Sequence, residues 1–426
     1  MRLADLIALV PLAATLVPGA PAGAAPNQAQ SVPVAGWNEF ISGAAALPEL
    51  ILDKLPRDMR DDPQVRQEVG RLALAAIVSE GLRALSPDGD HPLFLPSLNI
   101  VLNAGQPNAD TIYRSARITP GGSYRLRGLR GTARLVKLGQ TGPGPGDPTV
   151  AALPPSSRPY LDFDDLRLDK DGHYDLLISP EKPAGYKGDW WKLEPGTAML
   201  ILRTVASDWS KERDPTISIE RVDAPPSRPR PSTEEMEQLL RGLPAGAQFL
   251  GTLLVDYPHQ LREEGYLHSF KLRGPRPGGL AGQYYYESFF DLKDDEALVL
   301  EVKVPSQCKY RSLMLINEIE QAIDWYNNHS SLNDAQDHVD KDGVLRVVVS
   351  PKDPGVPNWL DTAGHARGMI QGRWTECSDQ PVPTVQKVKL AEVRKLLPGD
   401  TPHVTPQQRD AIIRQRRAAF QQRPLW

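Results

Sequence analysis

A segment near the C-terminal end of the chain gathers the side chains best suited to acid–base chemistry. The sequence PNWLDTAGHARGMIQGRWT, residues 357–375, places His365 four residues after Asp361 and ends with Arg373 close by. A carboxylate can orient a histidine that acts as general base, and an arginine can hold an anionic group through paired hydrogen bonds. His365, Asp361 and Arg373 are therefore candidate catalytic residues. Four further residues of the segment are candidate ligand-binding residues: Asn358, Trp359, Arg367 and Trp374.

A second group of polar side chains lies in PNADTIYRSARI, residues 107–118. Amide, carboxylate, phenol and guanidinium groups on a loop that enters a strand suit a polyhydroxylated or anionic ligand. The candidate ligand-binding residues here are Asn108, Asp110, Tyr113 and Arg114, with Asn103 shortly before them.

Both groups also have a structural interpretation. In the first, Gly364 and Gly368 would shape a turn, His365 would face solvent and Arg373 would make a structural ion pair. In the second, the Asn and Asp side chains would form Asx-turns that end the preceding segment. Clustered aromatic residues have the same two interpretations, stacking on a ligand or filling a core: Tyr186, Trp190, Trp191, Trp209, Trp325, Tyr326, Trp359 and Trp374.

The standard signatures of metal and nucleotide chemistry are missing. The sequence holds no H-E-x-x-H, no G-x-S-x-G and no P-loop, and its two D-K-D-G motifs place glycine at position 4 rather than at position 6 of a calcium-binding loop. We therefore predict no metal and no cofactor. The formal net charge of −4 provides no overall positive field for a phosphate backbone, so we predict no nucleic-acid partner.

The chain contains an internal repeat. Residues 169–180 are DKDGHYDLLISP and residues 340–351 are DKDGVLRVVVSP. The similarity extends further, because Trp190 and Arg203 parallel Trp359 and Arg373, and IYRSARI parallels YYYESFFDL. Asp-Gly between apolar runs is typical of a hairpin turn, so each copy is predicted to be rich in β-structure.

Three helices are predicted around the two copies. Residues 64–85 carry apolar side chains at helical spacing, Ser232 or Thr233 caps a second helix, and Thr405 followed by a proline opens a third. The arginines of the third helix are expected to form a solvated face or a contact in an oligomer.

The first 25 residues predict a signal peptide, with an apolar run from Leu6 to Val17 before small residues at 22–25. No later apolar run is long enough to cross a bilayer, so no transmembrane span is predicted in the mature chain. Cys308 and Cys377 are the only cysteines. An exported protein can bond them, and two separate buried thiols are the alternative.

The segments Pro357–Thr375 and Pro107–Ile118 resemble the family known as domain of unknown function 1214. The N-W-L opening, the later glycine and the R-W ending of the first segment carry the resemblance. It implies jelly-roll-type β-sandwich modules and no established chemistry.

We therefore predict a mainly β fold, with two tandem jelly-roll-like β-sandwich modules and flanking α-helices. The predicted divisions are a signal peptide (1–25), a helical region (26–99), module one (100–223), a proline-rich linker and helix (224–279), module two (280–390) and a helical tail (391–426).

The favoured function is that of a periplasmic or secreted protein that binds a carbohydrate or a small organic ligand. The alternatives are a metal-independent hydrolase or lyase centred on His365 and Asp361, and an oligomeric envelope scaffold. An enzyme would bring His365, Asp361 and Arg373 together in one cleft, whereas a scaffold would bury the tail helix between subunits.

Overall fold

The computed structural model describes residues 33–142, 160–275, 280 and 282–425, so the predicted signal peptide lies outside the described residues. Residues from Gly36 onward form one unit. Among the described residues, no helix combines the length and the hydrophobicity that a membrane span requires.

The first half of the strands forms two sheets. Sheet A has the order β1-β2-β8-β4-β5 and sheet B the order β7-β6-β3-β9. The bounds are β1 (Leu95–Leu98), β2 (Thr111–Arg117), β3 (Tyr124–Leu129), β4 (Leu135–Thr141), β5 (Tyr160–Asp162), β6 (His173–Ser179), β7 (Asp189–Lys192), β8 (Met199–Val205) and β9 (Ser218–Arg221).

The second half of the strands forms two more sheets. Sheet C has the order β10-β11-β17-β13-β14 and sheet D the order β16-β15-β12-β18. The bounds are β10 (Lys271–Arg273), β11 (Gln283–Asp291), β12 (Glu296–Lys303), β13 (Cys308–Ile316), β14 (Ser331–Asn333), β15 (Val344–Ser350), β16 (Trp359–Asp361), β17 (Arg367–Cys377) and β18 (Thr384–Lys389).

The two halves share one topology. Every strand of the first half has the same place in its sheet as the strand numbered nine higher in the second half, so β2 corresponds to β11 and β8 to β17. Even the exceptional parallel pairs match, because β6 pairs in parallel with β7 and β15 with β16. We call the two halves module one and module two.

Each module buries a core between its two sheets. In module one, Leu138 and Leu202 of sheet A pack with Leu126 and Leu176 of sheet B. In module two the core includes Tyr286, Trp374 and Leu300. The fold is thus sheet-rich with two sandwich-like halves, as predicted.

A repeated tryptophan closes one edge of each sandwich. The indole N–H of Trp190 donates to the Ser179 hydroxyl, and that of Trp359 donates to the Ser350 hydroxyl. Both serines precede the prolines of the repeated Ser-Pro pair, and each hydroxyl donates to a backbone carbonyl two residues further along. The repeat therefore preserves a structural contact, and Trp359, a candidate ligand-binding residue, is buried in that contact.

The repeated Asp-Gly turns form, but each lacks a full hairpin. Gly172 and Gly343 adopt positive φ angles of 87° and 77°. The strand before the second turn is reduced to the single bridge Val339–Leu345, and none precedes the first turn within the described residues. At the first turn, three exposed side chains place atoms that could bind a metal ion within 4.8 Å of one another: Asp169, Asp171 and His173. Backbone N–H groups of the turn already donate to Asp169.

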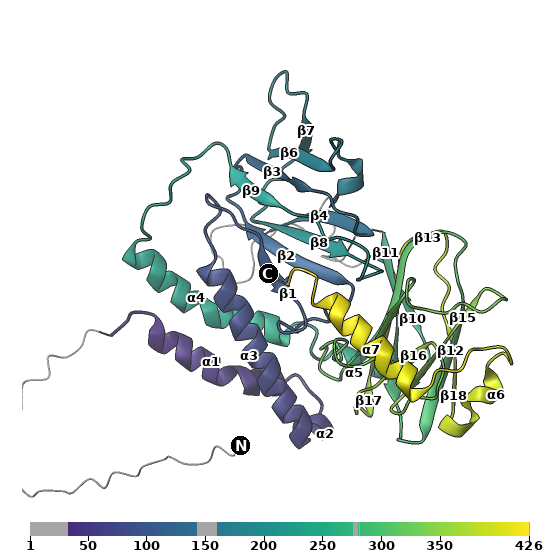
Figure 1. Cartoon of the computed structure of the whole chain (residues 1–426). Coiled ribbons are helices and arrows are strands. Elements are labelled where there is room, and N and C mark those ends of the chain that lie inside the picture. Colours follow the sequence, from purple (N-terminus) through teal and green to yellow (C-terminus); the bar gives the residue numbers. More distant parts are fainter. Residues whose placement is uncertain (1–32, 143–159, 276–279, 281, 426) are drawn as a thin grey trace, which may run out of the picture. The chain divides into compact units, whose positions relative to one another are not determined.

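The predicted helices begin where their capping residues indicate. Helix α3 (Pro63–Leu85) is capped by Asp62, and capping boxes open α4 (Thr233–Thr252) at Ser232 and α7 (Pro406–Phe420) at Thr405. Helix α1 (Trp37–Leu52) lies in the predicted helical region 26–99, although its position was not predicted. It packs with α3 and α4 in a separate helical core, visible beside the sheets in Figure 1. The remaining helices are short: α2 (Arg57–Arg60), α5 (Tyr257–Glu263), α6 (Val393–Leu396) and the 3-10 turns η1 (Phe163–Asp165) and η2 (Leu390–Glu392).

The prediction of a solvated arginine face on the tail was wrong for three of its arginines. Arg409, Arg416 and Arg423 are all buried. Arg409 pairs with Asp353 of module two, whereas Arg423 pairs with Asp214 of module one. The tail helix α7 and the residues after it therefore join the two modules of one chain (Figure 1).

His329, beneath this tail, should make stability depend on pH. Its ring is buried parallel to that of Trp359, and burial, followed by the charges of Arg416 and Arg409, lowers the pKa of His329 well below its usual range. The folded state keeps this histidine neutral, whereas the unfolded chain protonates it below about pH 6.5. Its contribution to stability is therefore present above that pH and is lost as the pH falls below it.

We expect the free energy of unfolding to decrease by about 1 kcal/mol more in the native protein than in His329→Gln when the pH is lowered from about 7.5 to 5.5. Urea unfolding at the two pH values measures this difference. Equal decreases in the two proteins would show that His329 does not control the pH dependence.

Candidate functional site

The duplication places the same tyrosine–arginine pair in both modules. Tyr113 on β2 lies opposite Arg203 on β8, and Tyr285 on β11 lies opposite Arg373 on β17. The guanidinium carbon of Arg203 is 6.0 Å from the centroid of the Tyr113 ring, and that of Arg373 is 5.7 Å from that of Tyr285. These distances allow cation–π attraction in both pairs.

Strand alternation turns both pairs away from the sandwich cores. Successive residues of a strand point to opposite faces of its sheet. Leu202 and Trp374 enter the cores of modules one and two. Their neighbours Arg203 and Arg373 therefore lie on the outer faces of sheets A and C.

Residues of the two outer faces line a cavity of about 230 Å³, which we call the inter-module cavity. Both tyrosine–arginine pairs line it. The other lining residues are Leu98, Gly105, Gln106, Asn108, Thr111, Val205, Leu254, Leu280, Gln283 and Gln371. A cavity between equivalent faces of two modules, with polar groups from both, is a usual location for a ligand site.

Arg373 supplies the strongest electrostatic feature of this cavity. Its side chain is almost completely buried, with 3% of the residue exposed. One terminal nitrogen donates to the side-chain oxygen of Gln371, and the other, Nη1, has no hydrogen-bond partner. Among the described residues, no carboxylate lies within ion-pair distance of Arg373. A guanidinium cannot lose its proton in a protein, so within the described part of the chain this buried charge has no carboxylate partner.

A polar network holds the floor of the cavity behind Arg373. The side-chain N–H group of Gln371 donates to Gln106 and to Glu287, and the Tyr257 hydroxyl also donates to Glu287. Glu287 is fully buried. The network orients Gln371, whose side-chain oxygen accepts from the guanidinium of Arg373.

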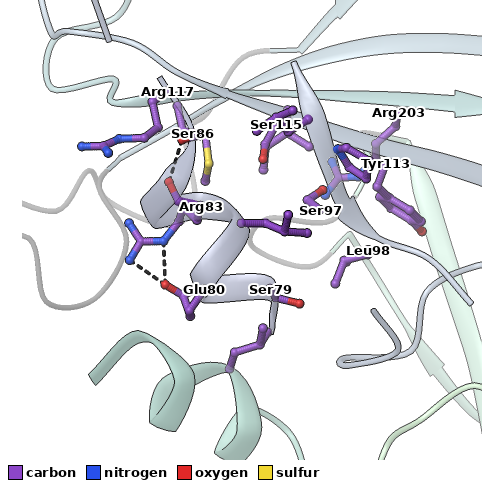
Figure 2. Close-up of a pocket in the computed structure, with 16 residues that line it drawn as sticks. Ser79, Glu80, Arg83, Ser86, Ser97, Leu98, Tyr113, Ser115, Arg117 and Arg203 are labelled. Carbon is purple, nitrogen blue, oxygen red and sulfur yellow. Dashed lines mark hydrogen bonds and ion pairs between the residues drawn. The ribbon is translucent and has the colours of Figure 1, made fainter. Parts of the chain in front are cut away.

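An apolar chamber adjoins the inter-module cavity. It also measures about 230 Å³ and lies between sheet A and the helices α3 and α4. Leu98, Tyr113 and Arg203 line both spaces. Figure 2 shows Tyr113 and Arg203 at one end of the chamber and Arg83, Ser86 and Arg117 at the other.

The structure does not bring the predicted catalytic group together. Asp361 ends β16 and His365 lies in the turn before β17, and the described residues show no hydrogen bond or ion pair between them. Asp361 instead accepts from the Ala363 N–H. Burial lowers the pKa of His365 and raises that of Asp361. Arg373 lies further along β17, in the inter-module cavity.

The other predicted residues of that segment have structural roles. The Asn358 side chain donates to backbone carbonyls of His338 and Arg346. Arg367 forms ion pairs with Glu318 and Asp58. Trp374 is buried in the core of module two, where its indole N–H donates to the Pro381 carbonyl.

The second predicted group is largely used to join the modules. The Asn103 side chain pairs with the backbone of Ala322 in module two. Asn108 donates to the Tyr310 hydroxyl, and Asp110 is buried among partners from both modules. Asn108 and Tyr113 also line the inter-module cavity, whereas Arg114 lines neither space.

Three aromatic side chains that could have bound a sugar ring do not expose the ring faces needed for it: Trp191, Trp325 and Tyr326. Trp191 packs against the core of module one, and Trp325 is 1% exposed. Tyr326 is partly buried against Phe420 of the tail.

Sequence reasoning missed four residues that complete the site. Gln106, Arg203, Tyr285 and Gln371 all line the inter-module cavity. The repeat carried a usable signal, because Arg203 aligns with Arg373 and both lie next to apolar core residues. Polar residues at matching positions on the non-core face of both copies indicate a shared interface.

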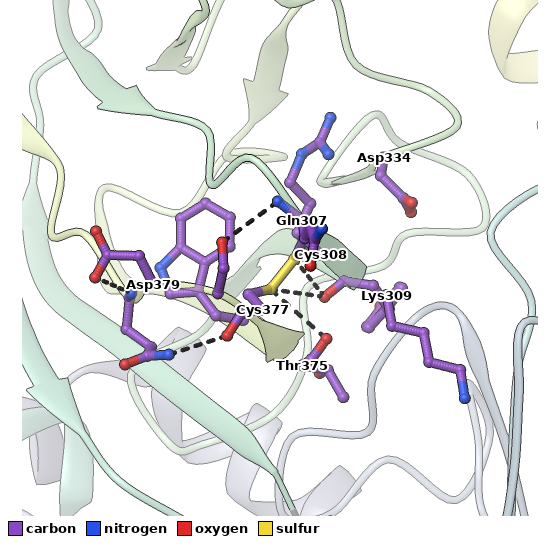
Figure 3. The surroundings of a disulfide bond; sticks show 12 residues. Gln307, Cys308, Lys309, Asp334, Thr375, Cys377 and Asp379 are labelled. Carbon is purple, nitrogen blue, oxygen red and sulfur yellow. Dashed lines mark hydrogen bonds between the residues drawn. A yellow bond between two sulfur atoms is a disulfide. The ribbon is translucent and has the colours of Figure 1, made fainter.

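Cys308 and Cys377 form a disulfide bond, which decides between the two alternatives left open by the sequence. They lie opposite each other on the antiparallel strands β13 and β17. Figure 3 shows the bond at the ends of these strands, with Lys309 and Thr375 beside it. β17 also carries Arg373, so the bond fixes the register of a strand that forms the site.

Comparison with known proteins identifies part of module two. Residues 289–371 match the model described as "Protein of unknown function (DUF1214)". Residues 289–371 are a DUF1214 family domain. The DUF1214 domain lies within the range predicted from the sequence and includes the end of β11, all of β12 to β16 and the first part of β17. No curated protein matches the chain.

Two solved structures are similar to this chain. An uncharacterized protein from Burkholderia cenocepacia is 28% identical, with a TM-score of 0.75, and the alignment covers 84% of this chain and 98% of that protein. The fold around the DUF1214 domain is therefore shared over nearly the whole relative. The VPA0106 protein from Vibrio parahaemolyticus is 12% identical with a TM-score of 0.42, covering 83% of this chain and all of that one.

Proposed function

We propose that this protein binds a small organic anion in the inter-module cavity. The observation that carries this proposal is the unpartnered Nη1 of Arg373 in an almost fully buried side chain. A buried charge without a counter-ion costs free energy, and a bound carboxylate would offset this cost. Charge-assisted hydrogen bonds of this kind are about twice as strong as neutral ones.

The geometry favours an anion over a neutral carbohydrate. Two arginines, one from each module, line the same cavity, and they supply only hydrogen-bond donors. The rings of Tyr113 and Tyr285, which line the cavity, already lie against these arginines, 6.0 and 5.7 Å from the guanidinium carbons. Within the expected class of small organic ligands, we therefore favour an organic acid.

The enzyme and scaffold alternatives receive no comparable support. His365 and Asp361 share no hydrogen bond, and the tail helix packs between the modules of its own chain instead of presenting its apolar face for a second copy. We also propose export to the periplasm or the exterior and a jelly-roll-type topology for both modules. The N-terminal sequence pattern supports the former, and the matched order of nine strands in each module is compatible with the latter.

Arg373→Gln should weaken the binding of a carboxylate about 10- to 100-fold, because it removes a charged donor that is already desolvated. Isothermal titration with butanoate and with butanamide, its neutral counterpart, measures the effect. Native protein should prefer butanoate, and Arg373→Gln should abolish this preference. Arg367→Gln is the matched control, because Arg367 lies on the same strand and lines neither space.

The stability of the same variant separates a binding arginine from a structural one. Removing a buried charge without a counter-ion should leave the free energy of unfolding unchanged or raise it by about 1 kcal/mol. A structural arginine would lower it. Unchanged butanoate affinity in Arg373→Gln, or equal affinity of the native protein for butanoate and butanamide, would contradict the proposal.

A further inference from the structure

We infer that the anion bound by this protein carries an unbranched hydrocarbon tail, which lies in the apolar chamber beside the inter-module cavity. This inference rests on the proposed function and specifies the class of ligand: a medium-chain alkanoate. Its carboxylate would lie between Arg373 and Arg203, and its tail would extend past Tyr113 between sheet A and the helices.

The first support is the continuity of the two spaces. Leu98 of β1, Tyr113 of β2 and Arg203 of β8 line both of them. If the carboxylate of a ligand binds Arg203 in the inter-module cavity, the carbon atoms that follow the carboxylate therefore lie where the chamber begins. Figure 2 shows Arg203 and Tyr113 side by side at that end.

The second support is the chemistry of the chamber wall. Its apolar side chains come from three layers of the fold, namely α3, α4 and sheet A: Leu82, Leu250, Leu95, Leu98, Met199 and Ile201. Ser97 and Ser115, between these residues, are small and leave the space open. Such a wall stabilises methylene groups through the hydrophobic effect and offers little to a second polar group.

The third support is the polarity of the far end, which sets a limit to the tail. Arg83 and Glu80 of α3 form an ion pair there, 2.6 Å between Nη2 and Oε2, and the Ser86 hydroxyl donates to the Arg83 carbonyl. A tail that reached this pair would have to displace it or turn away. Affinity should therefore rise with chain length and then level off.

The test is a titration of the purified protein with butanoate, hexanoate, octanoate and decanoate below their micellar concentrations. Each added methylene should tighten binding about fourfold, the factor that corresponds to burying one CH₂ group, until the tail reaches the Arg83–Glu80 pair. Ser115→Phe should fill the chamber. It should keep butanoate binding and remove the increase in affinity with chain length. Ser218→Phe, on an exposed strand of sheet B, is the matched control and should keep the gain.

The outcomes separate the inference from the proposed function. Butanoate binding that depends on Arg373 but does not tighten with chain length overturns the tail and leaves the anion site standing. If affinity still increases with chain length in Ser115→Phe, the inferred position of the tail in the chamber is also wrong. Absence of any Arg373-dependent binding overturns both. If Ser115→Phe does not fold, Leu250→Asn on α4 replaces it, and the same loss of gain is expected because the chamber wall becomes polar.

Discussion

Asp110→Ala should lower the free energy of unfolding by about 4 kcal/mol, the effect typical of breaking a buried charged network. One carboxylate oxygen of Asp110 accepts from the indole of Trp209 at 2.9 Å and from the amide of Asn333 at 2.7 Å. The other accepts from the Tyr310 hydroxyl at 2.6 Å. Alanine would leave three buried donors without an acceptor, and each such donor costs about 1–3 kcal/mol.

The position of Asp110 explains why so much depends on one side chain. Trp209 belongs to module one, whereas Tyr310 and Asn333 belong to module two, and the Asp110 carbonyl accepts from Arg423 of the tail. Burial raises the pKa of Asp110, while the hydrogen bonds from Tyr310 and Asn333 and the charge of Arg416 act in the opposite direction. The side chain of Asp110 therefore links the two modules, and its backbone carbonyl binds the tail.

Chemical denaturation of Asp110→Ala measures the loss, and a double-mutant cycle with Tyr310→Phe isolates one contact. We expect a coupling energy of about 1–3 kcal/mol between the two positions. Asp171→Ala, at an exposed turn of module one, is the control and should change stability by less than about 0.5 kcal/mol. A loss at Asp110 no greater than at Asp171 would refute the role assigned to this network.

Removal of the disulfide should have an effect of similar size. Cys308 and Cys377 are separated by 69 residues, and closing a loop of that length stabilises the folded state by about 4 kcal/mol in the chain-entropy model. The bond also holds β13 against β17, the strand that carries Arg373 and Gln371. The double variant Cys308→Ala/Cys377→Ala should therefore unfold at a markedly lower denaturant concentration than the native protein.

Reduction provides an independent measure of the same bond. A phosphine reductant should lower the unfolding midpoint of the native protein to that of the double variant, and should leave the double variant unchanged. A native protein whose midpoint is insensitive to both treatments would show that the bond does not stabilise the fold. An effect of reductant on the double variant would point to a cause other than the disulfide.

The architecture was largely predictable because it depends on local and periodic signals. The D-K-D-G and Ser-Pro pairs of the repeat lie at equivalent places in two modules of identical topology. Helices α3, α4 and α7 begin at their capping residues, since caps act within one helical turn. No separate helix was predicted for α1, because Gly36 offers no capping side chain and Pro48 lies inside the helix.

The candidate site was predictable only in part. Arg373, Asn108 and Tyr113 were selected from the sequence and do line the inter-module cavity. The grouping was wrong, because proximity in sequence was taken for proximity in space. His365 is eight residues from Arg373, yet on an extended strand that separation carries it to the other end of the sheet.

The sequence by itself determined the duplication, the strand-rich modules, the helix starts and the existence of two cysteines that could pair. Each of these follows from composition, spacing or local backbone preference, which neighbouring residues control. The tertiary structure alone decided that the outer faces of sheets A and C meet, that the tail arginines are buried and that Arg203 and Arg373 share a cavity. These facts depend on which faces of two separately folded sandwiches pack together, and no pattern within either copy specifies that choice.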